Sequence, residues 1–315
     1  MTSGIGWVFP GQGSQSVGMG RALFDAHPVA RDVYKEAASV LGYDVSALCF
    51  NGPAEQLNLT EYTQPALLTA SVAALRVLEP AGIVPGAVAG HSLGEYSALV
   101  AAGGVSFQAA LSLVQKRGRY MAEAVAPGSG LVAAILGLGA DAVREVCREA
   151  STVGVVAPAN YNCPGQIVIA GEKAAMERAM ELAKAKGCRK AIPLPVSVPV
   201  HTPLMKSAAE RLAADLAAVA WSDLTISLIN NVDGKVLRSA SEVQRSLVRQ
   251  LPSPVQWENS IKLMSELGVS VFVEVGPGTV LAGLIKRIVP DAVTLSVQDP
   301  KSLDQTLNTL SLSPK

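Results

Sequence analysis

The sequence has no excess of basic residues and few histidines and cysteines, which argues against a nucleic-acid site and a metal site. Basic and acidic residues are equal in number, 26 of each, whereas a nucleic-acid binder normally has a basic excess. The chain has only three histidines, and its four cysteines, Cys49, Cys147, Cys163 and Cys188, form no CxxC pair. We therefore expect no bound nucleic acid, no metal and no other cofactor. We expect the cysteines to be buried free thiols in a reducing cytoplasm.

The sequence also lacks an uninterrupted hydrophobic run long enough to cross a membrane. The segment 97–115 carries no charge, but Gly103, Gly104, Ser106 and Gln108 interrupt it, which favours two helices of a soluble protein. No basic head followed by an apolar run and a cleavage site opens the chain, so we expect no signal peptide. We expect a cytoplasmic monomer without membrane contact.

Hydrophobic residues are abundant. They make up 49% of the 315 positions, enough for one large core or for a large domain that carries a smaller one. Outside residues 128–197, short apolar strands alternate with helical patterns, which predicts a mostly parallel sheet covered by helices. The expected strands are 5–9, 84–89, 226–230 and 271–275, and the expected helices include 30–41, 66–78, 95–102, 106–123, 202–218 and 257–267. Thr202 is the expected N-cap of its helix.

The stretch 128–197 has a different order of elements. Strand patterns at 131–136, 153–159, 166–170 and 191–198 are separated by helical patterns at 140–149 and 174–186. The order β-α-β-β-α-β is that of the ferredoxin-like split unit. We therefore expect a ferredoxin-like domain at 128–197, inserted into a larger α/β domain formed by 1–127 and 198–315.

Ser92 lies in the sequence GHSLG at residues 90–94, between an apolar segment and a helical pattern. In a GxSxG motif a strand turns at once into a helix, and glycines leave room for the close backbone contacts of that turn. The serine then stands clear of the sheet, and the N–H of the next residue, Leu93, points to where an oxyanion would form. Glycine and serine are also common at ordinary turns, so the motif alone leaves Ser92 either a nucleophile or a corner residue.

A serine nucleophile needs a base, and three histidines are candidates by residue type. His27 precedes Pro28 at a helix entry that looks exposed, and His91 would point away from Ser92 at a sharp turn. His201 follows an apolar strand and precedes a helix, and sites in α/β proteins gather at the carboxyl ends of strands. The sequence favours His201 as the base, with a structural histidine near a helix N-terminus as the alternative.

Arg117 lies on the apolar face of its expected helix, together with Ala110, Leu113, Val114 and Met121. A buried guanidinium needs a partner. That partner is either an internal carboxylate or a carboxylate of the substrate, held by the two-pronged guanidinium. The sequence leaves both readings open.

Five motifs together are typical of one enzyme family. They are FPGQGSQ, QPALLTASVA, GHSLGEY, SVPVHTPLM and VEVGPGTVLAGL, and they extend over nearly the whole chain. With them the chain resembles the malonyl-CoA:acyl carrier protein transacylases of bacterial type II fatty acid synthesis. The resemblance implies an α/β-hydrolase-like large domain with a ferredoxin-like insertion. It also implies an acyltransferase that moves malonyl groups from malonyl-CoA to the phosphopantetheine thiol of acyl carrier protein.

The resemblance implies a role for each candidate residue as well. It implies that Ser92 forms the malonyl-serine intermediate and that His201 is the base. It implies that the backbone N–H groups of Gln12 and Leu93 form the oxyanion hole. It also implies that Arg117 binds the malonyl carboxylate and that the backbone carbonyl of Gln250 orients His201. Carrier proteins of this kind are acidic, so Arg189, Lys190 and Lys206 are candidates for docking, with ordinary surface charge as the alternative.

Two other functions predict different features. A serine hydrolase shares the GxSxG motif, but it predicts an acid between the serine and a histidine near the end of the chain. A non-enzymatic module that binds the carrier protein gives no reason for a serine on a sharp turn together with an inward arginine. Both fit the sequence less well than an acyltransferase.

Overall fold

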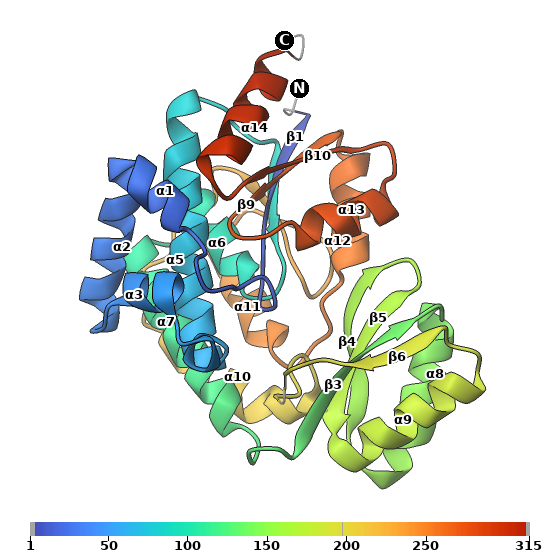
Figure 1. Cartoon of the computed structure of the whole chain (residues 1–315). Helices are drawn as coiled ribbons and strands as arrows, with labels where there is room; N and C mark the ends of the chain where they lie inside the picture. Colours follow the sequence, from blue (N-terminus) through green and yellow to red (C-terminus); the bar gives the residue numbers. More distant parts are fainter. Residues whose placement is uncertain (1–3, 197, 313–315) are drawn as a thin grey trace.

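The chain folds around two β-sheets of different size (Figure 1). The computed structural model describes residues 4–196 and 198–312. Within these residues one sheet has six strands in the order β10-β9-β1-β2-β7-β8, and the other has four in the order β4-β5-β3-β6. All four strands of the small sheet lie between β2 and β7 of the large one in the chain. The protein therefore has the mixed α/β fold that the sequence predicts.

The large sheet is mostly parallel, as the alternation of elements predicts. Its parallel strands are β1 (Ile5–Phe9), β2 (Ala87–Gly90), β7 (Ser227–Ile229), β9 (Val271–Val275) and β10 (Val293–Val297). The short strand β8 (Val236–Leu237) pairs antiparallel with β7 at one edge. Val8, Phe9, Val88 and Ala89 are fully buried, because helices cover both faces of these central strands.

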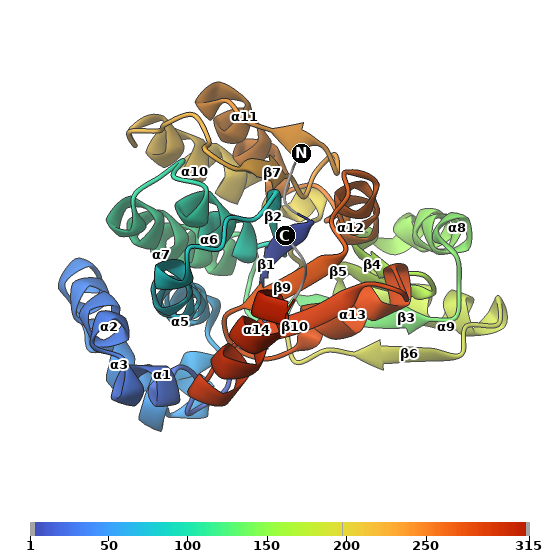
Figure 2. The same cartoon turned by 90° about the horizontal axis from the view of Figure 1, so that it is seen from above.

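Alternate residues of the strands pack against two separate groups of helices (Figures 1 and 2). One group is α1 (Arg21–Ala26), α2 (Pro28–Leu41), α3 (Val45–Asn51), α4 (Ala54–Leu57), α5 (Thr60–Leu78), α6 (Gly94–Ala101), α7 (Phe107–Glu123), α10 (Lys206–Ala217) and α11 (Ala240–Gln250). The other is α12 (Trp257–Glu266) and α13 (Val280–Ile288), while α14 (Pro300–Leu312) packs beside β10. Phe9 and Val88 face the first group, and Val8 and Ala89 face the second.

The small sheet has the predicted element order β-α-β-β-α-β. Its elements are β3 (Gly130–Leu136), α8 (Ala140–Ala150), β4 (Val156–Cys163), β5 (Gln166–Glu172), α9 (Lys173–Ala185) and β6 (Lys190–Pro193). Neighbouring strands are antiparallel throughout. The two helices pack on one face, where Val143, Val146, Met176 and Ala179 are fully buried.

Main-chain hydrogen bonds join β4 to the segment that leads into α12. The N–H of Tyr161 donates to the Val255 carbonyl (2.9 Å), and the N–H of Val255 donates to the Ala159 carbonyl (2.9 Å). Arg287 of α13 also donates to the Gln166 side chain (2.6 Å) and to the Pro164 carbonyl (3.0 Å). These contacts fix the small sheet against the large part of the molecule.

Several element boundaries differ from the sequence prediction, among them that of the strand expected at 84–89, which is Ala87–Gly90. The helix expected at 66–78 begins at Thr60. The Thr63 hydroxyl donates hydrogen bonds to the carbonyls of Leu57 and Leu59, and tertiary packing stabilises the helix on both sides of Pro65. The strand expected at 153–159 extends to Cys163, since its polar end pairs with β5 and Val255. The strand expected at 191–198 is Lys190–Pro193, and its residue 197 lies outside the described residues.

Thr202 is the N-cap residue of the turn that leads into α10, with Pro203 at the first position, as predicted, but its side chain does not cap the helix. Its hydroxyl donates to the Pro199 carbonyl (2.7 Å) instead of accepting from the helix. A 3₁₀ turn at Pro203–Met205 follows, and only then does α10 begin. The elements that were not predicted include β8, β10, α1, α3, α4, α11 and α14.

Candidate active site

Ser92 lies at the sharp turn between β2 and α6, which we call the elbow (residues 90–94). Its φ of 52° is in the left-handed region, which non-glycine residues rarely adopt. A Cβ on Gly90 would lie 1.9 Å from the Gly94 carbonyl carbon, and one on Gly94 would lie 2.1 Å from the Phe9 carbonyl oxygen. Both flanking positions therefore require glycine. The strained backbone at Ser92 is typical of a functional residue rather than an ordinary corner.

Asn231, two residues after the end of β7, holds the elbow by two hydrogen bonds. Its side-chain oxygen accepts the Ser92 N–H (2.7 Å), and its side-chain nitrogen donates to the Gly90 carbonyl (2.6 Å). Asn231 is buried. It was not among the candidates from the sequence. The only signal was a pair of asparagines at the carboxyl end of an apolar strand.

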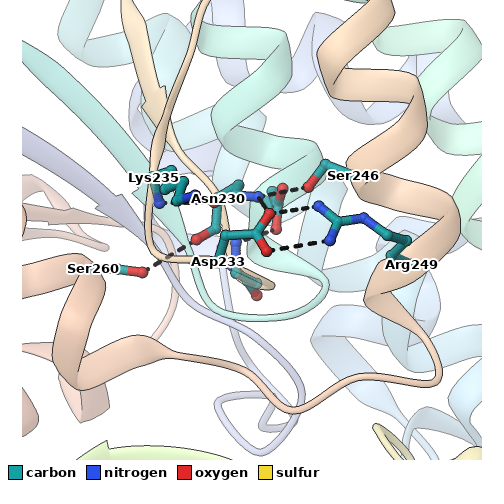
Figure 3. Close-up of polar contacts among 8 residues, drawn as sticks. Asn230, Asp233, Lys235, Ser246, Arg249 and Ser260 are labelled. Atoms are coloured by element: carbon teal, nitrogen blue, oxygen red, sulfur yellow. Dashed lines mark hydrogen bonds and ion pairs between the residues drawn. The ribbon is translucent and has the colours of Figure 1, made fainter.

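The turn that presents Asn231 is held against α11 (Figure 3). The Asn230 side chain donates to the Ser246 hydroxyl (2.8 Å) and accepts the Lys235 N–H (2.8 Å). Arg249 forms an ion pair with Asp233 in the same turn. These contacts fix the turn after β7, and α11 also carries Gln250 into the site.

His201, the base that the sequence favours, lies against Ser92. Its Nε2 is 2.7 Å from Ser92 Oγ, and its Nδ1 is 3.0 Å from the Gln250 carbonyl oxygen. Since a carbonyl only accepts, Nδ1 carries the proton and Nε2 is free to take one from the serine. Burial, and then the positive charge of Arg117, lower the pKa of His201 to about 3, so the ring is neutral at pH 7.

Arg117 projects from α7 into the same site, and Ser106 caps the start of that helix by accepting the Ala109 N–H (3.2 Å). The guanidinium donates to the Gln64 side-chain oxygen (2.7 Å), to Ser92 Oγ (3.0 Å) and to the Gln250 side-chain oxygen (2.9 Å). Among the described residues no carboxylate forms an ion pair with it, and its Nε has no acceptor. An internal carboxylate partner, one of the two sequence readings, is therefore absent from the described residues.

The side chain of Gln250 links Arg117 to a buried carboxyl group. Its oxygen faces Arg117, while its nitrogen donates to Glu95 Oε2 (2.8 Å) and to the Ser92 carbonyl (3.1 Å). Glu95 Oε2 also accepts the Asn231 N–H (3.1 Å). Burial raises the pKa of Glu95 to about 7. The sequence prediction used only the backbone carbonyl of Gln250 and did not identify Glu95.

The backbone N–H groups of Gln12 and Leu93 are free to bind an anion. Neither has an acceptor in the described parts of the chain. A Cβ on Gly11 would lie 2.2 Å from the His91 carbonyl oxygen, so the loop that carries Gln12 runs close against the elbow. The Gln12 side chain is held by the Thr60 hydroxyl, which donates to its oxygen (3.0 Å).

His91 points away from Ser92, as expected for a sharp turn. Its Nε2 is 2.9 Å from Asn162 Oδ1 of β4, and its ring lies 5.4 Å from that of Trp257. His91 therefore connects the elbow to the small sheet, and it is not placed to act on the serine.

A cavity of about 260 Å³ opens beside Gln12. It lies between the start of α5 at Thr60, the end of α7, and the segment that leads from β6 back to the large part, which contributes Val196 and Val198. In residues 4–196 and 198–312, no group of three or more histidine, cysteine or acidic side chains is placed to hold a metal ion. No helix within that range is long and apolar enough to cross a bilayer.

Comparison with known proteins gives consistent matches over nearly the whole chain. The family model described as acyl transferase domain matches residues 6–301. The malonyl CoA-acyl carrier protein transacylase of Escherichia coli is 49% identical over 302 residues, which are 96% of this chain and 98% of that protein. An acyl carrier protein S-malonyltransferase from Vibrio cholerae is 48% identical, with a TM-score of 0.94 over 96% of this chain and 100% of the other. A malonyl-transacylase solved in complex with a type II PKS acyl-carrier protein is 47% identical, with a TM-score of 0.95 over 97% of this chain and 99% of the other.

Proposed function

The chain belongs to the acyl transferase family and, within it, to the malonyl CoA-acyl carrier protein transacylases, and we propose that Ser92 and His201 carry out that transfer. The enzyme moves a malonyl group from malonyl-CoA to the phosphopantetheine thiol of acyl carrier protein, for fatty acid synthesis. It is an acyltransferase whose partners are malonyl-CoA and acyl carrier protein. We further propose a cytoplasmic location and a monomeric state.

In the first half-reaction, Ser92 Oγ attacks the thioester carbonyl of malonyl-CoA while His201 Nε2 takes the hydroxyl proton. The resulting oxyanion is bound by the N–H groups of Gln12 and Leu93, and one such donor lowers the barrier by about 3 kcal/mol. The C–S bond then breaks, and the CoA sulfur takes the proton from His201. Malonyl-Ser92 remains on the enzyme.

The second half-reaction reverses these steps with a new thiol. His201 takes the proton of the phosphopantetheine thiol, whose sulfur attacks the carbonyl of malonyl-Ser92. The same two N–H groups bind the oxyanion, the C–O bond to Ser92 breaks, and the serine oxygen recovers the proton. The products are malonyl-acyl carrier protein and free enzyme, so the proton balance closes without a cofactor.

The observation that carries this proposal is the cation beside the nucleophile. The guanidinium of Arg117 is buried, lies 3.0 Å from Ser92 Oγ and, within the described residues, is hydrogen-bonded only to neutral oxygens. A buried cation favours an anion as its partner, and a malonyl ester on Ser92 carries its free carboxylate close to that position. The Gln250 carbonyl, which orients His201, argues against a serine hydrolase, because a hydrolase normally uses a carboxylate there.

We also propose a division into a catalytic domain at 1–127 and 198–315 and a ferredoxin-like domain at 128–197. Residues 1–3, 197 and 313–315 of this division lie outside the described part of the chain. The location of the small sheet between β2 and β7 supports the division. The cavity beside Gln12 lies where the two parts meet, which suits a site that must admit a long thioester arm.

The test is to mix the protein with malonyl-CoA and the phosphopantetheine form of acyl carrier protein, and to follow the intact mass of the carrier. We expect malonyl-carrier to accumulate much faster than free malonate. Release of malonate at the same rate with and without carrier would identify a hydrolase instead.

A further inference from the structure

The side-chain amide of Gln250 lies between a buried cation and a buried carboxyl group. Its oxygen accepts from Arg117, and its nitrogen donates to Glu95. The two ends of an amide have nearly the same size and shape, so packing alone does not decide which end faces which neighbour. In the reversed orientation the NH₂ group would face the guanidinium, and Arg117 would lose one of its three acceptors.

Glu95 is the nearer of the two acceptors that favour this orientation of the amide. Its Oε2 offers only acceptor capacity to the amide, and the Asn231 N–H holds it in place. The Ser92 carbonyl, the other acceptor for the Gln250 nitrogen, is farther away, at 3.1 Å. Glu95 forms no hydrogen bond with Arg117, His201 or Ser92 Oγ among the described residues. Its hydrogen bonds reach the site through Gln250 and through Asn231, which accepts the Ser92 N–H.

We propose that Glu95 is a positioning residue for malonyl selectivity, because it locks the Gln250 amide with its oxygen toward Arg117. The locked oxygen holds the guanidinium beside Ser92 Oγ, ready for the substrate carboxylate. This inference rests on the proposed function, in which Arg117 binds that carboxylate. It assigns a role to the acidic residue of the GHSLGEY segment beyond the elbow itself.

Glu95 acts through its shape and its acceptor oxygen rather than through its charge. Its second oxygen, Oε1, has no donor in the described residues. The NH₂ group of a glutamine therefore fits at that position without losing a hydrogen bond, while the remaining oxygen still accepts from Gln250 and Asn231. Burial raises the pKa of Glu95 to about 7, so the native site already tolerates a neutral group there.

A crossed pair of variants separates these two properties. Glu95→Gln keeps the length and the acceptor oxygen but removes the charge. Glu95→Asp keeps the charge, but it withdraws the carboxylate by about one C–C bond, roughly 1.5 Å, and so breaks the 2.8 Å contact with Gln250. Glu274→Asp is the matched control, because Glu274 is a similarly buried carboxyl group whose hydrogen-bond donors in the described part of the chain are the N–H groups of Leu281 and Ala282.

The measurement is the ratio of malonyl to acetyl transfer from the two CoA thioesters, together with KM for malonyl-CoA and the melting temperature. Glu95→Gln should keep the ratio within about threefold of the native value. Glu95→Asp should lower the ratio at least tenfold, mainly through a higher KM for malonyl-CoA. Glu274→Asp should lose melting temperature but keep the ratio.

Three results would overturn the inference: an unchanged ratio in folded Glu95→Asp, an equal loss in Glu95→Gln, or the same shift in Glu274→Asp. If Glu95→Asp is insoluble, Glu95→Met removes the acceptor at similar volume and must show the same loss. The native enzyme gives a separate reading of the proposed function. If it forms no malonyl adduct at all, the proposed function fails. If it forms a normal adduct but the ratio of malonyl to acetyl transfer is unchanged in Glu95→Asp, only the role of Glu95 is wrong.

Discussion

Removing Arg117 should convert a malonyl-selective enzyme into one that no longer distinguishes malonyl from acetyl. The guanidinium is buried and, among the described residues, makes three hydrogen bonds, all to uncharged oxygens. A malonyl carboxylate would give it a directly bonded anionic partner. Loss of one partner from a buried charge pair typically costs about 2–5 kcal/mol. In Arg117→Ala, kcat/KM for malonyl-CoA should therefore fall by about 30-fold to 5000-fold.

Acetyl-CoA should respond in the opposite way. It has no carboxylate, so in the native enzyme it leaves a buried guanidinium without an anion, and that penalty disappears with the arginine. We expect acetyl transfer to stay constant or to rise in Arg117→Ala. The assay mixes both thioesters with each protein and reads the two adducts of Ser92 by intact mass. A merely misfolded variant loses both adducts, so the ratio carries the information.

The variant also needs a check of its own fold. Without Arg117, the oxygens of Gln64 and Gln250 each lose a donor, which costs stability. The reasoning is refuted if malonyl and acetyl transfer fall by the same factor while the melting temperature remains native. Arg117 would then support the fold of the site, and the carboxylate would have to bind elsewhere.

Three further predictions concern the base and the carrier protein. Burial and Arg117 lower the pKa of His201 to about 3, so kcat/KM for malonyl-CoA should stay level as the pH falls from 7 to 5. A fall in kcat/KM with a midpoint near pH 6.5, the usual pKa of a histidine, would contradict this. His201→Ala should lower the initial rate of transfer by about two to four orders of magnitude, whereas His91→Ala keeps His201 as its base and should lose far less. The reverse pattern of initial rates would exchange the roles of the two histidines. Transfer to carrier protein should slow as salt is raised and should weaken in Lys206→Ala, since Lys206 is exposed shortly after His201. A rate that does not depend on salt would argue against steering.

The elements that carry the chemistry could be predicted from the sequence because their local signals are strong. Gly90 and Gly94 are required by backbone contacts near 2 Å, and such positions leave a readable motif. Arg117 could be placed on a buried helix face, because the periodicity of α7 is regular and Ser106 caps its start. His201 was found from its position after an apolar stretch.

The residues that were missed depend on contacts between distant parts of the chain. Asn231 meets Ser92 only because β7 pairs with β2, and no local pattern around residue 231 encodes that pairing. Glu95 lies next to Tyr96 on a short helix, where an acidic residue in the first turn is ordinary. Its burial follows from packing against Gln250, which is 155 positions away in the sequence.

The errors in the boundaries have a similar cause. Pro65 favoured a helix start after it, but Thr60, Thr63 and Gln64 are buried before it. Gln64 also forms hydrogen bonds with Met121 and Arg117 of α7, and this packing overrides the local preference. Thr202 has the residue type of an N-cap, yet its hydroxyl is used by Pro199 in the loop that carries His201. The positive φ of His201, 61°, belongs to the same loop and could not be read from the sequence.

The central claim is that Ser92 carries the malonyl group between two thiols, and the most direct test is the intact mass of the protein after brief exposure to malonyl-CoA without carrier. The native protein should gain one malonyl group, and addition of the phosphopantetheine form of acyl carrier protein should remove it as malonyl-carrier. Ser92→Ala should gain none. A malonyl adduct of equal yield on Ser92→Ala, or a native adduct that the carrier protein cannot discharge, would contradict the account.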